Sequence, residues 1–333
     1  MDKSTAAHDD NGNLCLGPRV IPPPKSISEQ ARKFLATPNP LMASEDPPAH
    51  EKEAWRKRIA RFNAMMEPMA DQMLQSAPAE VETKIIAGVT VHVGTPHQMP
   101  ERNRGRARID LHGGGMVLLA GKFAMAGAAM AAVRTGCVVY SVDYRVPPDH
   151  PFPAALDDTV AVYRELLNTY RPGDIVISGA SGGGNLAAAA ALKIRDLGIP
   201  LPAGLVLLTP EVDLTESGDT FETNRHIDVV LKNGLPEMIK LYADGHDLND
   251  PYLSPLFGDF TKGYPPTFIQ TGTRDIFLSN SVRMHRALLR AGIEVELHVW
   301  EAMPHGGFGG TTPEDAEVQA EIGRFMAKHW GTA

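Results

Sequence analysis

Cysteine is nearly absent from this sequence: Cys15 and Cys137 are the only two among 333 residues. Two cysteines, one in a polar leader and one in an apolar segment, cannot build the disulfide framework of a small secreted domain. Long apolar runs are also lacking, and none reaches the roughly 18 residues that span a bilayer. The first twenty residues carry Asp and Asn where a signal peptide would have its apolar core. These absences predict a soluble, cytoplasmic protein with no membrane span.

Positive charge is also in short supply. Lys and Arg number 32 against 40 Asp and Glu, so the formal net charge is −8. Nucleic acids and anionic membranes both attract a basic face, so a chain of this charge is not expected to bind either. The histidines show neither His-x-x-x-His spacing nor the cysteine and carboxylate neighbours of a metal site, so no metal is expected.

Helical patterns without strand signals occupy residues 1–80, which we interpret as a leader followed by cap helices. Ser26-x-x-Glu29 has the spacing of a capping box and precedes a short apolar helical face. A second helix is predicted after a break at 38–48. Its apolar face consists of Trp55, Ile59, Phe62 and Met66. The methionines near its end are predicted to fill the core or to line a pocket, namely Met65, Met66, Met69 and Met73.

Strands alternate with helices in residues 81–333, which predicts an α/β catalytic domain on a mainly parallel sheet with helices on both faces. An antiparallel hairpin around Ala87-Gly88 leads the sheet. The expected strands are 81–86, 89–93, 108–111, 137–142, 174–179, 203–208, 267–271 and 295–300. The expected helices are 121–135, 153–169, 183–197, 280–292 and 313–329. Residues 211–250 interrupt this alternation and are predicted to be an insertion, with a helix at 235–243, that folds back onto the N-terminal helices.

A serine lies at the centre of the most informative motif, Gly179-x-Ser181-x-Gly183, between an apolar strand and an alanine-rich helix. A serine on so tight a strand-to-helix turn has strained backbone angles, so the residues two before and two after it must be glycine. Its Oγ is then exposed at the positive end of the helix, where a developing oxyanion is stabilised. The motif therefore predicts a nucleophile.

Two other interpretations fit the same residues. One is an ordinary strand-to-helix loop. The other is a dinucleotide-binding fingerprint, Gly182-x-Gly184-x-x-Ala187, with Glu211 near the end of the next strand as the ribose ligand. The motif alone does not decide between them.

A glycine-rich loop, His112-Gly113-Gly114-Gly115, follows another predicted strand. Glycines leave backbone N–H groups unshielded and free to converge on a small anion. A flexible loop is the alternative. Paired with the serine turn, the loop predicts an oxyanion hole in which Gly113 and Gly114 donate from one side and Gly182 from the other.

A candidate acid and a candidate base follow two later strands. Asp275 comes after 267–271, and His305 comes after 295–300. Because the carboxyl ends of parallel strands meet at one edge of a sheet, both side chains are predicted to lie beside Ser181. The chain order Ser, Asp, His is that of α/β-hydrolases, and it excludes the dinucleotide interpretation.

Together these motifs resemble those of the bacterial hormone-sensitive lipase family of α/β-hydrolase esterases. The resemblance spans roughly residues 80–330. It rests on His112-Gly113-Gly114-Gly115, Asp143-Tyr144-Arg145, the stretch Pro151 to Asp158, the stretch Gly179 to Gly184, Ser254-Pro255-Leu256, Asp275 and His305-Gly306. It implies hydrolysis of short-chain carboxylic esters under a helical cap, without metal or cofactor. The family often dimerises through its last strand, so a homodimer is also implied.

The chain departs from the family pattern at three positions around the site. These are Ala180 in place of an acidic residue or threonine, Gly182 in place of alanine, and Met116 in place of an aromatic residue. They bear on substrate preference rather than on the chemistry. Glu211 also stands where an aromatic residue is frequent, and no role beyond a structural hydrogen bond is expected for it. Arg145, Asp157 and Asp158 are predicted to be a structural network, because buried carboxylates are tolerated when they are paired.

The sequence therefore predicts a serine carboxylesterase with a small-molecule ester as its partner. Ser181 attacks, His305 accepts its proton, and Asp275 orients His305, whose pKa is expected near or below that of free imidazole, roughly 6.5. Six residues are predicted to line the substrate pocket, namely Met116, Phe34, Trp55, Phe62, Met66 and Met69. Lactone or amide hydrolysis at the same site, and a non-catalytic receptor of the same fold such as the plant gibberellin receptors, are the alternatives.

Overall fold

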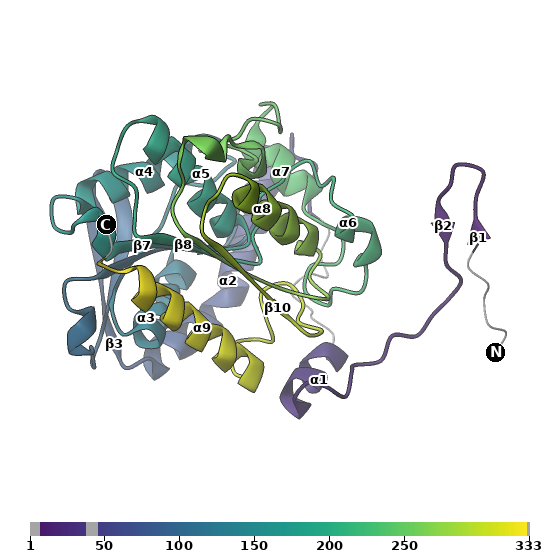
Figure 1. Cartoon of the computed structure of the whole chain (residues 1–333), viewed down its shortest axis with the longest axis horizontal. Coiled ribbons are helices and arrows are strands. Elements are labelled where there is room, and N and C mark those ends of the chain that lie inside the picture. The colour runs from purple at the N-terminus through teal and green to yellow at the C-terminus, as the bar shows by residue number, and fades with distance from the viewer. Residues whose placement is uncertain (1–6, 38–45, 332–333) are drawn as a thin grey trace.

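An eight-stranded sheet forms the centre of the molecule (Figure 1). The computed structural model describes residues 7–37 and 46–331. The strands lie in the order β10-β9-β8-β7-β5-β6-β4-β3. Their bounds are β3 (Ala79–Ile86), β4 (Val89–Pro96), β5 (Ala107–Leu111), β6 (Val138–Val142), β7 (Ile175–Ala180), β8 (Gly204–Leu208), β9 (Thr267–Gly272) and β10 (Val295–Trp300). The eight strands predicted for the sheet are confirmed, close to their expected bounds.

The sheet is parallel from β6 through β10, while β3 and β4 join it antiparallel. The central strands are apolar and rich in β-branched residues, which suits burial on both faces. The predicted hairpin is confirmed, with Ile86 paired to Val89 across Ala87 and Gly88. Ala87 and Gly88 have φ of 51° and 83°, and such positive values are typical of a two-residue turn between strands.

Helices cover both faces of this sheet (Figure 1). One face carries α4 (Ala154–Leu166), α5 (Gly182–Asp196) and α8 (Leu278–Arg290). The other carries α3 (Lys122–Thr135) and α9 (Pro313–His329). All five match predicted helices. The alanine run 187–191 of α5 is completely buried, so the small side chains let this central helix pack closely on the sheet.

The start of the chain contains strands that the sequence analysis did not expect. β1 (Ala7–His8) and β2 (Leu14–Cys15) form a small antiparallel hairpin that projects from the body of the molecule (Figure 1). The expectation of no strand before residue 81 is therefore wrong. The turn contains Asn11-Gly12 with Gly12 at φ 80°, and Asn-Gly is a strong hairpin signal that was available in the sequence.

The first helix, α1 (Glu29–Ala36), begins after Ser28 rather than after Ser26. The Ser28 Oγ accepts the N–H of Ala31 at 3.1 Å. Ser28 also donates to the carboxylate of Glu314 on α9, from its N–H at 2.6 Å and from its Oγ at 2.8 Å. The predicted capping box at Ser26 is therefore wrong, because a tertiary contact with α9 fixes the start of the helix two residues later.

The second N-terminal helix and the insertion lie side by side. The insertion contains α6 (Thr220–Thr223) and α7 (Pro236–Ala243), and α2 (Lys52–Ser76) is the long N-terminal helix. The N–H of Ala49 donates to Glu237 of α7 at 2.8 Å. Lys52 and Asp244 form an ion pair at 3.8 Å. The insertion thus contacts the start of α2, one of the N-terminal helices onto which it was predicted to fold.

The predicted apolar face of α2 is confirmed, with Ile59 half-buried against the core. Trp55, Phe62 and Met66 are buried and belong to the core cluster that includes the sheet. Met65 and Met69 are 48% and 47% exposed, so the prediction that they fill the core is wrong. No helix in the described ranges 7–37 and 46–331 is both long and apolar enough to cross a membrane.

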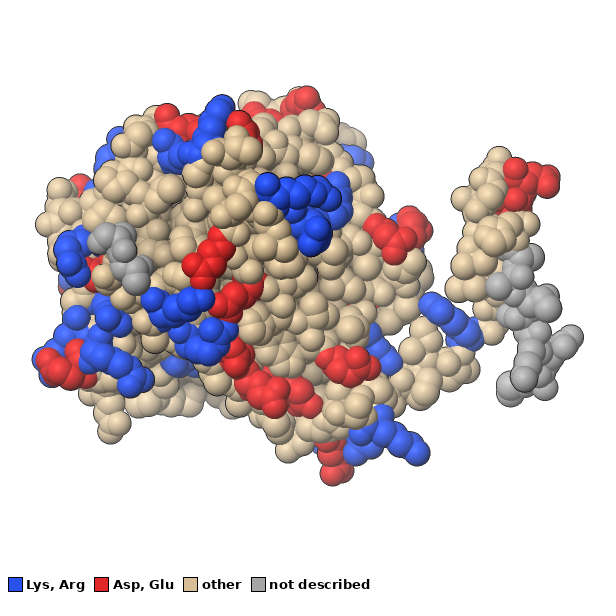
Figure 2. All heavy atoms as spheres, viewed as in Figure 1, with Lys and Arg blue, Asp and Glu red and all other residues tan. Residues whose placement is uncertain are grey.

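Charges of both signs are interspersed on the face of the molecule shown in Figure 2. Over α9 and β10, for example, Lys328 pairs with Glu294 at 2.5 Å. Such pairing leaves no single basic field on this face of the protein.

Candidate active site

Ser181 lies at the turn between β7 and α5, with φ of 56° and ψ of −120°. Residues with side chains rarely adopt these angles, so the surrounding structure must hold the turn in place. The N–H of Ser181 donates to the carbonyl of Leu208 at 2.9 Å, and the N–H of Asn185 donates to the carbonyl of Ser181 at 3.1 Å. A Cβ on Gly179 would overlap the carbonyl of Gly183, and a Cβ on Gly183 would overlap the carbonyl of Leu111, which is the steric reason for glycine on both sides of the serine.

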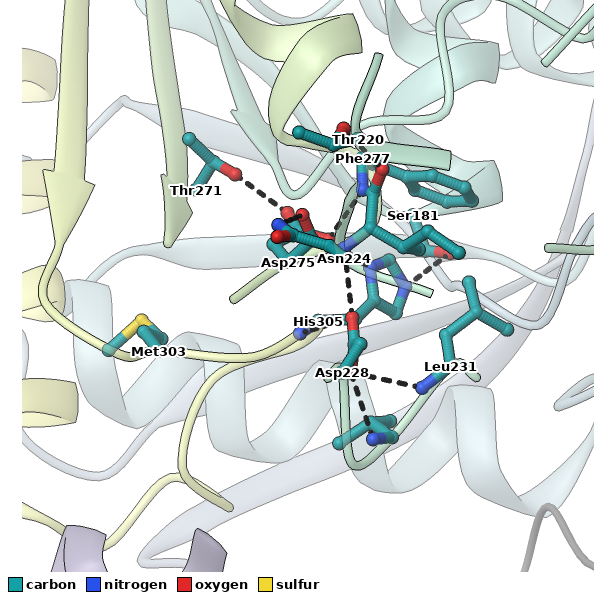
Figure 3. A network of polar contacts seen from close by, with 12 residues as sticks. Ser181, Thr220, Asn224, Asp228, Leu231, Thr271, Asp275, Phe277, Met303 and His305 are labelled. Carbon is teal, nitrogen blue, oxygen red and sulfur yellow. Dashed lines mark hydrogen bonds and ion pairs between the residues drawn. The ribbon is translucent and has the colours of Figure 1, made fainter. Parts of the chain in front are cut away.

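The structure brings Asp275 and His305 together beside Ser181 (Figure 3). Nε2 of His305 is 2.9 Å from the Oγ of Ser181, and Nδ1 is 3.1 Å from Oδ1 of Asp275. Asp275 is fully buried and also accepts from the Oγ1 of Thr271 at 2.7 Å and from the N–H of Phe277 at 2.9 Å. With Nδ1–H donating to Asp275, Nε2 is left to accept a proton from the serine.

The pKa of His305 is raised above its ordinary value. Burial of the imidazole lowers this pKa, but the hydrogen bond and charge of Asp275, with the charge of Asp228 added, raise it by more. The expectation of a pKa near or below that of free imidazole is therefore wrong. The sequence did not reveal the second buried carboxylate.

The glycine-rich loop lies against the serine turn. A Cβ on Gly113 would lie 3.5 Å from the Cβ of Ser181. Gly114 and Gly115 have φ of 95° and 59°, which glycine adopts without strain. In the described part of the chain, no hydrogen bond uses the N–H of Gly113, Gly114 or Gly182 as its donor. These three groups are thus available to a ligand beside Ser181.

His112, at the start of this loop, is held by a residue to which the sequence analysis gave no role. The hydroxyl of Tyr144 donates to the carbonyl of His112 at 2.7 Å, and the two rings stack at 4.0 Å. Burial lowers the pKa of His112. The neutral imidazole of His112, stacked on Tyr144, therefore holds the start of the glycine-rich loop in place. The Asp143-Tyr144-Arg145 motif was the sequence signal for this contact.

Met116 occupies the space that an alanine at position 182 would need. A Cβ on Gly182 would lie 2.5 Å from the Sδ of Met116 and 2.8 Å from its backbone N. Met116 itself is completely buried. Two of the departures from the family pattern, Met116 and Gly182, are thus in direct contact with each other.

The residues predicted to line the pocket differ widely in exposure. Trp55 and Met116 have no exposed surface, and Phe62 and Met66 are each 6% exposed. Trp55 and Met116 therefore offer no surface to a substrate in this structure, and Phe62 and Met66 offer little. Met69 is 47% exposed on α2.

Phe34 packs against the loop that carries His305. Its ring lies edge-on to that of Phe308 at 6.1 Å. On the other side of the site, two insertion side chains cover the glycine loop, because a Cβ on Gly115 would lie 3.1 Å from Leu235 and 2.8 Å from Met238. Sequence reasoning had not placed Leu235 or Met238 at the site.

Glu211 is buried beside the serine turn, where its backbone rather than its carboxyl makes the hydrogen bonds. Its N–H donates to the carbonyl of Ser181 at 3.3 Å, and its carbonyl accepts from Asn185 at 2.8 Å. Neither carboxyl oxygen has a hydrogen-bond partner in the described part of the chain. Burial, with the charge of Glu216 added, raises the pKa of Glu211 well above its usual range, which favours the neutral form of this carboxyl.

The predicted charge network is present for Arg145 and Asp158 but does not include Asp157. The guanidinium of Arg145 binds the buried Asp158, with Nε at 3.0 Å and Nη2 at 2.7 Å. Asp157 is exposed and pairs with Lys193 instead. Within residues 7–37 and 46–331, no group of three or more His, Cys, Asp or Glu side chains is arranged to hold a metal ion.

Residues 109–308, more than half of the chain, match the sequence profile of the α/β-hydrolase fold family. The matched region contains Ser181, Asp275 and His305. The chain belongs to this family.

Relatives of this α/β-hydrolase include esterases. An acetyl-hydrolase of Streptomyces hygroscopicus is 36% identical over 208 residues, which are 62% of this chain and 69% of the relative. The crystal structure of an esterase matches with a TM-score of 0.87 at 34% identity, covering 96% of this chain and 99% of that one. An esterase from the bacterial hormone-sensitive lipase family matches with a TM-score of 0.79 at 30% identity, covering 91% and 99%. The family resemblance is thus confirmed, and the protein is an esterase of the α/β-hydrolase superfamily.

Proposed function

We propose that this α/β-hydrolase is a serine carboxylesterase that hydrolyses short-chain acyl esters. The observation that carries the proposal is the line of hydrogen bonds from Ser181 through His305 to Asp275, at 2.9 Å and 3.1 Å. A serine is a poor nucleophile until a neighbouring base takes its proton, and here the base is in turn oriented by a buried carboxylate.

The reaction follows from this geometry in two halves. Ser181 Oγ attacks the ester carbonyl while Nε2 of His305 takes the hydroxyl proton. The oxyanion of the tetrahedral intermediate accepts the unused N–H groups of the oxyanion hole, namely Gly113, Gly114 and Gly182. His305 then gives its proton to the leaving alcohol. In the second half it activates a water molecule that hydrolyses the acyl-enzyme.

We infer the preference for short acyl chains from the insertion side chains that lie over the glycine loop. Leu235 and Met238 lie against Gly115 of the glycine loop and limit the room beside it for a long chain. The name acetyl-hydrolase of one relative agrees with a small acyl group.

A panel of p-nitrophenyl esters of increasing acyl length tests this proposal. We expect turnover of the acetate ester, the highest kcat/KM for chains of a few carbons, and a decline beyond them. Each methylene that fits contributes at most about 0.8 kcal/mol, whereas one that clashes with Leu235 or Met238 costs more. Lactones and anilides in the same panel should react more slowly.

Three results would count against it. Failure to turn over any ester would favour a non-catalytic receptor. Preference for a lactone or anilide would indicate a different acyl hydrolase. A kcat/KM that rises with acyl length would show that the cap does not restrict the acyl chain.

The pH dependence of kcat/KM should report the raised pKa of His305. Catalysis needs this histidine neutral, so a raised pKa means that activity is lost at a higher pH on acidification than for free imidazole. We expect the midpoint of the acid limb above roughly 6.5. Measurement with p-nitrophenyl acetate from about pH 5 to about pH 9 checks this. A midpoint below that of free imidazole would show that burial outweighs the carboxylates.

A further inference from the structure

A second carboxylate, that of Asp228, is buried beside the catalytic candidates (Figure 3). It belongs to the insertion, between α6 and α7. Its Oδ1 accepts the N–H groups of Val230 at 2.9 Å and Leu231 at 3.1 Å. Its Oδ2 accepts those of Ile276 at 3.0 Å and His305 at 3.1 Å. Four backbone amides thus converge on one side chain, and each favours its anionic form.

The two oxygens of Asp228 serve different parts of the structure. Oδ1 fixes a turn within the insertion. Oδ2 joins the loop after β9, at the residue following Asp275, to the loop after β10, at His305 itself. A single oxygen therefore connects the backbones of the two loops whose side chains must meet at 3.1 Å.

Two other side chains of the insertion form hydrogen bonds with the loop that carries Asp275. The side-chain amide of Asn224 donates to the carbonyl of Asp275 at 2.8 Å, and the Oγ1 of Thr220 donates to the carbonyl of Ile276 at 2.7 Å. Thr220, Asn224 and Asp228 follow one another at intervals of four residues. The insertion thus holds the Asp275 loop by its carbonyls and, through Asp228, by an amide.

We propose that Asp228 is a positioning residue for ester hydrolysis, through which the insertion keeps Asp275 and His305 in register and places a second negative charge beside the imidazole. This inference rests on the function proposed above. Transfer of the serine proton creates an imidazolium, and both buried carboxylates stabilise it more than the neutral ring.

The charged groups that face His305 are Asp275 and Asp228. Burial lowers the pKa of His305, and both carboxylates raise it. The pKa of Asp228 is raised above its ordinary value, because burial and the charge of Asp275 outweigh the charge of His305 and the amide donors, which lower it. Removal of the Asp228 charge should therefore lower the pKa of His305, because one of the two anions that stabilise its protonated form is lost.

Asp228→Asn tests the proposal, since it keeps the shape of the side chain and removes its charge. One of the two oxygens becomes an NH2 group facing N–H donors, so at least one pair of hydrogen bonds is lost. With p-nitrophenyl acetate we expect kcat to fall by about tenfold to a hundredfold with little change in KM, because small misplacement of catalytic groups has effects of that size. The acid limb of kcat/KM should also move to lower pH.

Asp213→Asn is the matched control. Asp213 is an equally buried carboxylate of the same insertion. Its partners are Thr215 at 2.5 Å, Ser217 at 2.8 Å and Arg283 at 2.5 Å, and none of them belongs to the loops of Asp275 or His305. Loss of this charge should lower the unfolding temperature but leave the acid limb where it is in the wild type.

The outcomes separate this inference from the proposed function. A wild type without esterase activity, or an active Ser181→Ala variant, would remove both. An active wild type with an inactive Ser181→Ala variant, but with Asp228→Asn unchanged in kcat and acid limb, would remove only the role of Asp228. An equal shift of the acid limb in Asp213→Asn would mean that Asp228 affects catalysis only by stabilising the insertion in general.

If Asp228→Asn does not accumulate as folded protein, the wild type supplies the test. The backbone amides of His305 and Ile276 should exchange slowly with solvent deuterium in a nitrogen-15-labelled sample, because Asp228 holds both. Rapid exchange of these two amides would overturn the proposal.

Discussion

Ser181→Ala is expected to abolish esterase activity and to leave the protein folded. The Oγ of Ser181 is the hydroxyl at 2.9 Å from Nε2 of His305, and alanine offers no atom that can form an acyl-enzyme. The fall in kcat should be about 10⁶-fold, the order found when the nucleophile of such a triad is removed. The check is turnover of p-nitrophenyl acetate by the purified variant, with circular dichroism to establish the fold.

A second substitution at the same position separates activity from stability. Ser181 has φ of 56° and ψ of −120°, angles that glycine adopts without strain. Backbone strain of this kind costs about 1–3 kcal/mol, and glycine at position 181 would relieve it. Part of this gain in stability is lost again, because glycine also makes the unfolded chain more flexible and so favours unfolding. Ser181→Gly should therefore be as inactive as Ser181→Ala but unfold at a higher temperature. Turnover by either variant, above that of a mock purification, would exclude Ser181 as the nucleophile.

His305→Ala and Asp275→Asn should also be severely impaired, with the smaller loss at Asp275. The losses should not add when the substitutions are combined, because the three residues act as one unit. Additive losses in the double variants would mean that they act independently.

The arrangement of Ser181, Asp275 and His305 was accessible from sequence for a topological reason. Each residue lies in the segment that follows the carboxyl end of a strand, and parallel strands place such segments along one edge of a sheet. The motif spacing around Ser181 added a steric signal, which the overlap between a Cβ on Gly179 and the carbonyl of Gly183 explains. Local chemistry and chain topology pointed to the same edge, so this part of the site could be predicted.

Asp228 could not be predicted in the same way. It lies in an irregular part of the insertion, and its partners are backbone amides, which every residue except proline carries. No residue type at His305 or Ile276 indicates that an acceptor lies opposite. The raised pKa of His305 was missed for the same reason, since part of its cause is this carboxylate.

The start of α1 and the exposure of Met69 show a related limit. Ser26 and Ser28 are equally good caps by residue type, and Glu314 of α9, far away in sequence, selects Ser28. Met69 has the residue type of a core position, yet it is 47% exposed on a helix whose buried face is set by its neighbours. Both features depend on tertiary contacts, which the residue periodicity within one segment does not reveal.

Gly183→Ala should be highly damaging for an addition of a single methyl group near the site. A Cβ at this position would overlap the carbonyl of Leu111 and lie 2.5 Å from that of His112, at the end of β5. Both atoms are backbone, so no side-chain rotation relieves the clash, and α5 and the glycine loop must separate. Overpacking of this kind costs about 3 kcal/mol or more when the backbone has to shift. The same displacement moves Ser181 away from the N–H groups of Gly113 and Gly114.

We therefore expect Gly183→Ala to give little folded protein, and the folded fraction to have a markedly lower unfolding temperature and greatly reduced kcat for p-nitrophenyl acetate. Gly127→Ala is the matched control, because Gly127 also lies in a helix, α3, but a Cβ there would meet no atom within 4 Å. In that open position, alanine should stabilise the protein by about 0.4–1 kcal/mol and leave turnover unchanged. If Gly183→Ala unfolded at the wild-type temperature and kept its kcat, the close contact between the serine turn and the glycine loop would not be what assembles the site.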